Sequence, residues 1–220
     1  MATTNGQRIG IWVIAAVLVI GTVGGFLAMV LAPQNQAKDT AYQEKLTADF
    51  QKEYEAYNKK VEAQADELSK KYYEEFSQYQ SRVAPFDGSN VNELKKEDLK
   101  EGTGEALTSK STFTAYYIGW TPDGKVFDGS IENGKLKAPF TVENGSGVIE
   151  GWTKGVDGMK VGGVRELTIP AAQAYGAEKN EQNELAGQPL KFVLMVIESP
   201  EKIEAPTMPR ELQELYYGQQ

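Results

Sequence analysis

The feature that most constrains this chain is a stretch of 24 residues, 9–32, that contains no charged side chain: IGIWVIAAVLVIGTVGGFLAMVLA. As a helix it would be about 36 Å long, which is enough to cross the hydrocarbon core of a bilayer. Arg8 and the amino terminus are the only positive groups before it, and all 31 acidic residues follow it. The positive-inside rule therefore predicts a cytoplasmic N-terminus (1–8), a single uncleaved span (9–32) and an extracytoplasmic remainder at the cell membrane.

Residues 34–84 are rich in Glu, Lys, Gln, Ala and Tyr and contain no glycine or proline. This composition predicts a long helical stalk, opened by a capping box at Thr40 and Gln43. Its large apolar residues follow a 4-4-3 spacing, an 11-residue repeat that keeps the apolar stripe almost parallel to the helix axis. The stripe consists of Leu46, Phe50, Tyr54, Tyr57, Val61, Ala65, Leu68, Tyr72, Phe76, Tyr79 and Val83.

Two interpretations of this stripe stay open. It could be the seam of a parallel, coiled-coil-like homodimer, and Gly21 and Gly25 would then allow two transmembrane helices to approach closely. It could instead be the apolar face of a single helix that packs against the following domain. A third placement, on the membrane surface, is disfavoured by the acidic polar face.

From residue 92 the composition changes to glycine, β-branched residues and short alternating runs, after a turn-rich linker at 85–91. The pattern predicts one antiparallel α+β domain over 92–200 and a tail over 201–220. Strands are expected at 112–120, 125–128, 139–143, 164–169 and 190–198, and a short helix at 149–158. The tail fragment RELQELYY suits one or two helical turns.

The composition excludes several classes of function. The chain has no histidine and no cysteine, so it has no Ser-His-Asp triad, thiol nucleophile, disulfide or Cys/His metal site. Its net charge of -8 argues against nucleic acid as a partner, because phosphate binding requires clustered Lys and Arg.

Four motifs follow one another along the predicted domain: YYIGWTPDGKVFDGS, PFTVENGSGVIEGWTKGVDGMKVGG, AYGAE and PLKFVLMVIES. With these motifs the chain resembles the FKBP-type peptidyl-prolyl cis-trans isomerases (EC 5.2.1.8), over roughly half of its length. The stalk in front is similar in layout to the macrophage infectivity potentiator type. The resemblance implies an FKBP-like antiparallel sheet of five or six strands, curled around the short helix with an apolar pocket between them.

The resemblance also implies the roles of individual residues. Trp152 would form the pocket floor, and the walls would be Tyr117, Phe127, Phe140, Val148, Ile149 and Phe192. The Tyr175 hydroxyl and the Ile149 N–H would donate to carbonyls of a bound peptide, with Asp128 at the rim near the twisted amide. Such a site needs no cofactor and no metal. The competing interpretation is that these aromatic residues are ordinary core.

One loop departs from the family pattern. Asn180, Asn183 and Glu184 fall where drug-binding members carry histidine and isoleucine, and Leu185 is the only large apolar residue nearby. We therefore expect weak macrolide binding.

The expected function is isomerisation of X-Pro bonds in extracytoplasmic polypeptides, which assists their folding. A catalytically weak module that binds proline segments, or a chaperone on an oligomerising membrane stalk, is the alternative.

Overall fold

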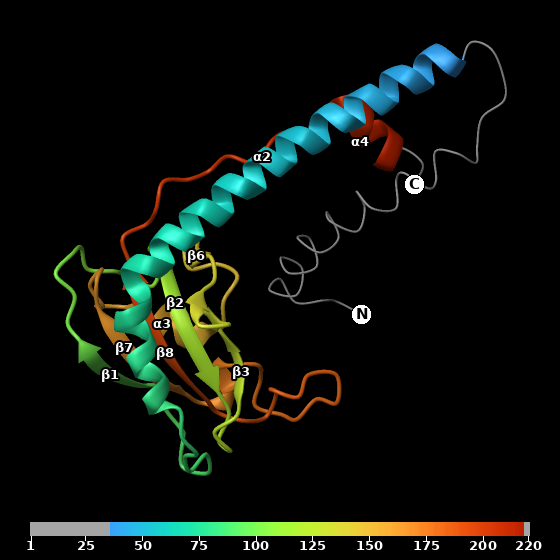
Figure 1. Cartoon of the computed structure of the whole chain (residues 1–220). Coiled ribbons are helices and arrows are strands. Elements are labelled where there is room, and N and C mark those ends of the chain that lie inside the picture. The colour runs from blue at the N-terminus through green and yellow to red at the C-terminus, as the bar shows by residue number, and fades with distance from the viewer. Residues whose placement is uncertain (1–35, 218–220) are drawn as a thin grey trace. The chain divides into compact units, whose positions relative to one another are not determined.

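The computed structural model describes residues 36–217 (Figure 1). The predicted membrane span, 9–32, and its glycine pair lie outside these residues. Within the described range, no helix is long and apolar enough to cross a membrane. The chain divides into two compact units, one formed by residues 63–201 and one that includes the described residues up to 62 and from 202 onward.

Helix α2 runs from Gln36 to Ser77 and continues as the 3-10 helix η1, Gln78–Arg82. No glycine or proline interrupts it, which explains its length. Thr40 lies inside α2, so the predicted capping box does not mark its beginning. The chain becomes extended at Val83, so the helix has ended before Ala84, the residue whose conformation Pro85 restricts.

The unit of residues 63–201 is built on a six-stranded antiparallel sheet in the order β1-β7-β8-β2-β3, with β6 also paired to β2. Its strands are β1 (Lys95–Lys100), β2 (Phe113–Trp120), β3 (Val126–Gly129), β6 (Phe140–Val142), β7 (Val164–Ile169) and β8 (Leu190–Ile197). The helix α3 (Glu150–Val156) and the 3-10 helix η2 (Ala171–Gln173) complete the unit. The predicted α+β class, the antiparallel sheet and the five predicted strands are confirmed, within one or two residues at their ends.

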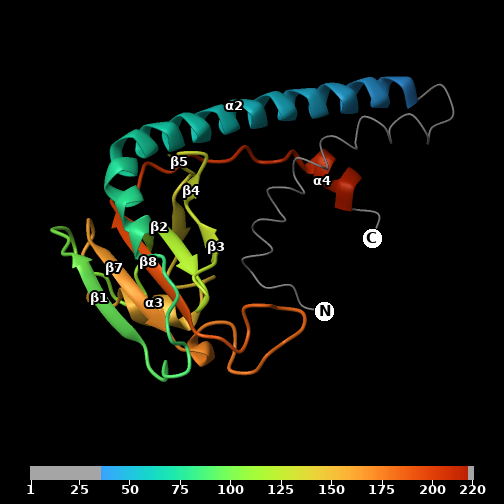
Figure 2. The same ribbon diagram turned by 60° about the horizontal axis from the view of Figure 1, so that its bottom comes forward.

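Three strands were not expected from the sequence. β1 reads KKEDLK and has no alternating apolar residues, so its only signal is the backbone pairing with β7 that the fold provides. The other two, β4 (Ile131–Glu132) and β5 (Lys135–Leu136), form a short hairpin. Ser69 of α2 accepts a hydrogen bond from the Leu136 N–H at 2.9 Å, and this places the hairpin against the helix (Figure 2).

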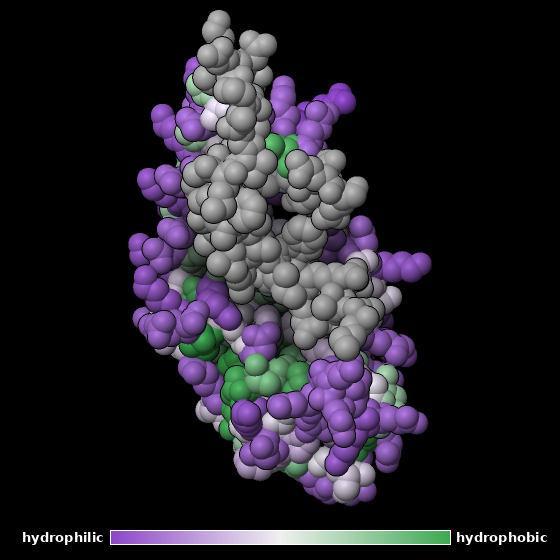
Figure 3. All heavy atoms as spheres, turned by 90° about the vertical axis from the view of Figure 1, so that its right-hand side faces the viewer, coloured by the Kyte–Doolittle hydropathy of each residue, from purple (hydrophilic) through white to green (hydrophobic). Residues whose placement is uncertain are grey.

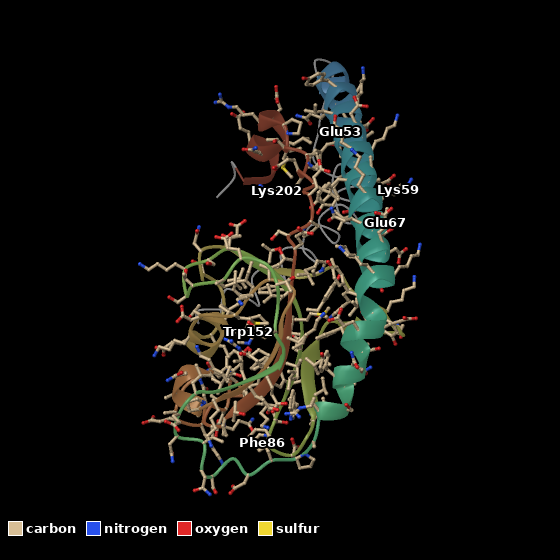
Figure 4. The ribbon with its side chains drawn as sticks, turned by 90° about the vertical axis from the view of Figure 1, so that its left-hand side faces the viewer. Glu53, Lys59, Glu67, Phe86, Trp152 and Lys202 are labelled. Atoms are coloured by element: carbon tan, nitrogen blue, oxygen red, sulfur yellow. The ribbon has the colours of Figure 1, made fainter. Side chains whose placement is uncertain are left out.

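The sheet has an apolar cluster on each face, because successive residues of β2 point in opposite directions. Tyr116, Ile118 and Trp120 belong to the cluster that faces α2. Tyr117 packs against the other cluster, which contains Trp152 of α3 (Figure 4). Tyr116 and Tyr117 therefore lie on opposite faces of the sheet.

The end of the helix and the predicted linker belong to the fold of the domain. Phe76 is fully buried in the cluster that faces α2. The Trp120 indole N–H donates to the Ala84 carbonyl at 3.1 Å, and the Phe86 N–H donates to the Pro122 carbonyl at 2.9 Å. The compact unit that contains the predicted domain spans residues 63–201, and the last third of the apolar stripe packs against the sheet of the same chain.

In the other unit, the first part of the stripe stays half-buried along α2. Phe50, Tyr54 and Tyr57 form a row of rings with centroids 6.2 and 5.7 Å apart. The tail contains α4 (Arg210–Tyr217), about two turns long as its sequence predicted, and Leu212 within it is buried.

Candidate active site

The short helix α3 is pressed tightly onto the sheet. A Cβ atom at Gly151 would collide with Ile169, and one at Gly155 would collide with Leu167. Only glycine allows this approach, and it brings the next residue, Trp152, to rest against the sheet, 4% exposed.

Four aromatic rings converge on this indole or on its neighbours. The Trp152 centroid lies 5.1 Å from Tyr117, 5.4 Å from Phe192 and 6.1 Å from Phe140. Phe127 completes the group, 5.5 Å from Phe192. Every pair is edge-to-face, with interplanar angles of 75–88°, which is the arrangement that the ring quadrupoles favour.

Val148 and Ile149 border these rings from the segment that leads into α3, and both are half-buried. Ile149 has extended backbone angles and caps the helix, and its carbonyl accepts the Trp152 N–H at 3.0 Å. Its own N–H has no hydrogen-bond partner among the described residues. The backbone donor implied by the resemblance is therefore free to bind a ligand.

The polar edge of the pocket is formed by two tyrosines and one carboxylate. The Tyr117 hydroxyl donates to one oxygen of Asp128 at 2.6 Å, and the Gly129 N–H donates to the other at 2.8 Å. Burial raises the pKa of Tyr117, and the hydrogen bond to Asp128 raises it further. Burial likewise raises the pKa of Tyr175, with an added contribution from the Asp128 charge. Both hydroxyls therefore stay protonated near neutral pH, and the Tyr117 proton is already held in the hydrogen bond to Asp128.

Comparison with known proteins identifies the family. The sequence profile of the FKBP-type peptidyl-prolyl cis-trans isomerases matches residues 103–197. The FK506-binding protein of Neisseria meningitidis serogroup B is 44% identical over 82 residues, which are 37% of this chain and 72% of that protein. The chain belongs to the FKBP-type peptidyl-prolyl cis-trans isomerase family.

Two further proteins are similar to this chain. FK506-binding protein 4 of Chaetomium thermophilum is 49% identical over 82 residues, 37% of this chain and 16% of that protein. A crystal structure of a peptidyl-prolyl cis-trans isomerase from Pseudomonas syringae pv. tomato is 27% identical. It covers 62% of this chain and 93% of that chain, with a TM-score of 0.41.

All nine predicted site residues of this FKBP-type chain lie in one region of one unit. Eight of them belong to the Trp152 cluster or bond to one of its members: Asp128, Ile149, Trp152, Tyr117, Phe127, Phe140, Val148 and Phe192. The ninth is Tyr175, whose pKa is raised by the negative charge of Asp128. Its side chain is 38% exposed. The fold therefore brings together the residues that the resemblance implies.

Two buried polar atoms in this part of the chain lack a partner, the Trp152 Nε1 and the Gln173 Oε1. Unpaired buried polar groups are rare because each one costs free energy. Gln173 was not singled out in the sequence, and nothing in its local pattern marks it.

Sequence reasoning also missed Arg165, which holds the end of α3. Its guanidinium donates to the carbonyls of Gly155 at 2.7 Å and Asp157 at 3.2 Å. Two further nitrogens bind both oxygens of Asp98, at 2.6 and 3.0 Å, and this pairing lowers the pKa of Asp98. The signal was present, since a charged residue inside an apolar strand usually has a partner.

The loop after Tyr175 is built on its asparagines. The Asn180 side chain accepts the Gln182 N–H at 2.9 Å, and the Asn183 side chain accepts the Leu185 N–H at 3.1 Å. Leu185 packs against the Trp152 cluster. Asn180 and Asn183 therefore shape the loop, and they are not simply polar substitutes for apolar rim residues.

Proposed function

We propose that this chain isomerises X-Pro peptide bonds of extracytoplasmic polypeptides in the pocket around Trp152. The observation that carries the proposal is the convergence of aromatic rings on one buried indole in a chain of this family. A proline ring would lie against the indole, with the amide that precedes it at the polar edge.

The physical basis is the resonance of the amide. Rotation about a peptide bond costs about 18–20 kcal/mol because twisting destroys the partial double bond. Water bound to the carbonyl oxygen strengthens that resonance, and an apolar aromatic pocket removes the water. Each 1.36 kcal/mol by which the pocket favours the twisted amide over the planar one gives about a tenfold rate.

Two donors would hold the peptide while the bond rotates. The Ile149 N–H and the Tyr175 hydroxyl would bind carbonyls on either side of the proline. Asp128 accepts hydrogen bonds from Tyr117 on one oxygen and from Gly129 on the other. It would therefore contribute to the site through the hydrogen bond that it accepts from Tyr117. No proton transfer is needed, which is compatible with a chain that lacks histidine and cysteine.

The test is the exchange rate of short X-Pro peptides, measured by NMR, with and without the protein. We expect Trp152→Leu to lower the acceleration at least tenfold and Tyr175→Phe to lower it less. Tyr116→Phe is the matched control, because it removes a hydroxyl on the opposite face of the sheet. A wild-type protein that accelerates none of several X-Pro peptides would rule out the proposal.

The second candidate, a module that binds proline segments without appreciable turnover, is favoured by the polar loop after Tyr175. That loop gives a ligand little apolar area besides Leu185. Tight binding of an X-Pro peptide without faster exchange would identify this function.

We propose further that residues 9–32 anchor the chain in the cell membrane with the isomerase domain outside the cytoplasm. The uncharged stretch and the charge asymmetry around it support this orientation. Protease added to intact cells should remove the domain, and full protection would contradict the topology.

The first part of the apolar stripe, from Leu46 to Val61, is proposed as the surface of a homodimer. Sedimentation of the full chain in detergent, beside a Phe50→Lys, Tyr54→Lys variant, tests this. Equal sedimentation of the two as monomers would show that the stripe does not mediate association.

A further inference from the structure

A cleft of about 370 Å³ lies beside strand β3, on the face of the sheet that η1 covers. About half of its lining is apolar, formed by Val83, Ile118, Val126, Phe127 and Ile131. The rest is formed by Gln80, Asp128, Gly129, Glu132 and Lys137. Val126 is 48% exposed, one of the few large apolar side chains of the described residues that remain open to solvent.

The strand beside the cleft is an edge of the sheet (Figure 1). β3 pairs with β2 on one side, and no other strand in the described part of the chain pairs with it. An edge strand has backbone donors and acceptors that can pair with an extended chain, while pockets beside it bind alternate side chains. An extended peptide is therefore the ligand for which this cleft is suited.

The cleft and the candidate active site share two residues of β3. Phe127 and Asp128 line the cleft, and the same residues contact Phe192 and Tyr117 of the aromatic pocket. Figure 3 shows an apolar area, bordered by hydrophilic side chains, on this side of the molecule. A four-residue strand is only about 13 Å long, so one polypeptide could reach both places.

We propose that the cleft binds an apolar side chain of the client polypeptide, a few residues away from the proline that occupies the aromatic pocket. The inference rests on the proposed isomerase function. Gln80 and Val83 of the cleft wall precede the family-matched region, 103–197, so the N-terminal extension supplies part of this subsite. Glu132 and Lys137 also line the cleft, and the apolar side chain of the client would lie among Val83, Ile118, Val126 and Ile131.

The experiment compares three fluorescent peptides with the same X-Pro centre, bound to the full chain in mild detergent. One is a tetrapeptide, one is extended to about 40 Å with Val and Leu at alternate positions on both sides, and one has the same length with Ser instead. We expect the apolar long peptide to bind about tenfold tighter than the serine peptide, the gain for burying one aliphatic side chain.

The decisive variant is Val126→Lys, which places a charge in the cleft and suits an edge strand. It should abolish the difference between the two long peptides and leave the tetrapeptide unchanged, and Val126→Thr should reduce the difference partially. Tyr42→Lys, at an exposed aromatic residue of the other unit, is the matched control and should keep the difference.

Equal binding of the two long peptides by the wild type would overturn the subsite, and so would an undiminished difference in Val126→Lys. Equal weakening of all three peptides by Val126→Lys would also overturn it, because the substitution would then act on the aromatic pocket. Failure of the proposed function would show separately, as no acceleration of the tetrapeptide by the wild type.

Discussion

At the scale of the residue, the candidate site depends on how polar atoms are satisfied at the edge of an apolar pocket. Tyr117 packs its ring edge-to-face on Trp152 and donates a hydrogen bond from its hydroxyl to Asp128. The same residue is therefore part of the apolar wall and part of the polar rim. Asp128, in turn, is held by Tyr117 and by the Gly129 N–H, which fixes the end of β3.

This bond predicts coupling between Tyr117→Phe and Asp128→Ala. A hydrogen bond to a charged acceptor contributes more than a neutral one, so we expect a coupling free energy of unfolding of about 1 kcal/mol. Urea unfolding of the wild type, the two single variants and the double variant measures it. The cycle Tyr116→Phe with Asp128→Ala is the control, since Tyr116 lies on the opposite face. Additive effects in the first cycle would contradict the role of the bond.

The raised pKa values of Tyr117 and Tyr175 predict alkaline sensitivity. A pKa that is higher in the folded state means that folding favours the neutral phenol. This contribution to stability is complete below about pH 10, the ordinary value, and is lost as the pH rises through the folded-state values. The unfolding free energy of the wild type should fall more between pH 9 and 11 than that of Tyr175→Phe. Parallel curves for the two proteins would contradict this prediction.

At the scale of the element, α3 is positioned by β7. Glycines let the helix approach the strand, and Arg165 binds its C-terminal carbonyls, so the place of Trp152 is set by residues distant in sequence. The loop after Tyr175 is a separate element whose shape depends on its asparagine side chains.

Removing Arg165 should loosen α3. Arg165→Met leaves the Gly155 and Asp157 carbonyls without their donor, and we expect a loss of about 3 kcal/mol in the unfolding free energy. Arg165→Lys keeps the charge without the forked geometry and should cost less. Thermal unfolding and the near-ultraviolet signal of Trp152 report the two effects. Wild-type stability in Arg165→Met would show that the helix end is fixed by packing alone.

An apolar side chain in place of Asn183 would disturb the loop after Tyr175, because the Asn183 side chain shapes that loop. Asn183→Ile would remove the acceptor of the Leu185 N–H and displace the only large apolar residue of the loop. We therefore expect Asn183→Ile to make residues 176–189 exchange amide hydrogens faster and to give no gain in macrolide affinity. Glu184→Ile, which keeps the asparagine, is the control and should leave exchange unchanged. A gain in macrolide affinity with Asn183→Ile would contradict this account.

At the scale of the whole chain, the helix that precedes the domain is a structural part of it. Arg82 binds the buried Glu166 at 2.7 Å and Glu97 at 2.8 Å. Lys191, a second partner of Glu166, lies over the Phe86 ring. Residues from Ser69 to Phe86 thus complete one face of the sheet.

A fragment that begins at residue 92 should consequently be much less stable than one that begins at 63. Loss of Phe76 alone removes a fully buried aromatic side chain, on the order of 3–5 kcal/mol. Urea unfolding of 63–220 and 92–220, followed by circular dichroism, tests this. Equal midpoints would show that the helix adds nothing to the domain.

The sequence by itself determined the local pattern of this protein. Alternation along β2 places Tyr116 and Tyr117 on opposite faces, because this signal lies in neighbouring positions. The residues that surround Trp152 are instead implied by the resemblance of the four motifs to the FKBP-type family. The strand β1 could not be found in this way, since KKEDLK is a strand only because β7 offers it hydrogen bonds.

Tertiary structure alone decided what the apolar stripe contacts. An 11-residue repeat indicates that one face of a helix is apolar. It does not indicate the partner, because a second copy of the chain and the sheet of the same chain can bury that face equally well. Phe76 is buried by Tyr116 and its neighbours, contacts that link residues 40 positions apart and leave no trace in a local pattern. The position of Arg165 beneath α3 was decided in the same way, because its partners come together only when the sheet has formed.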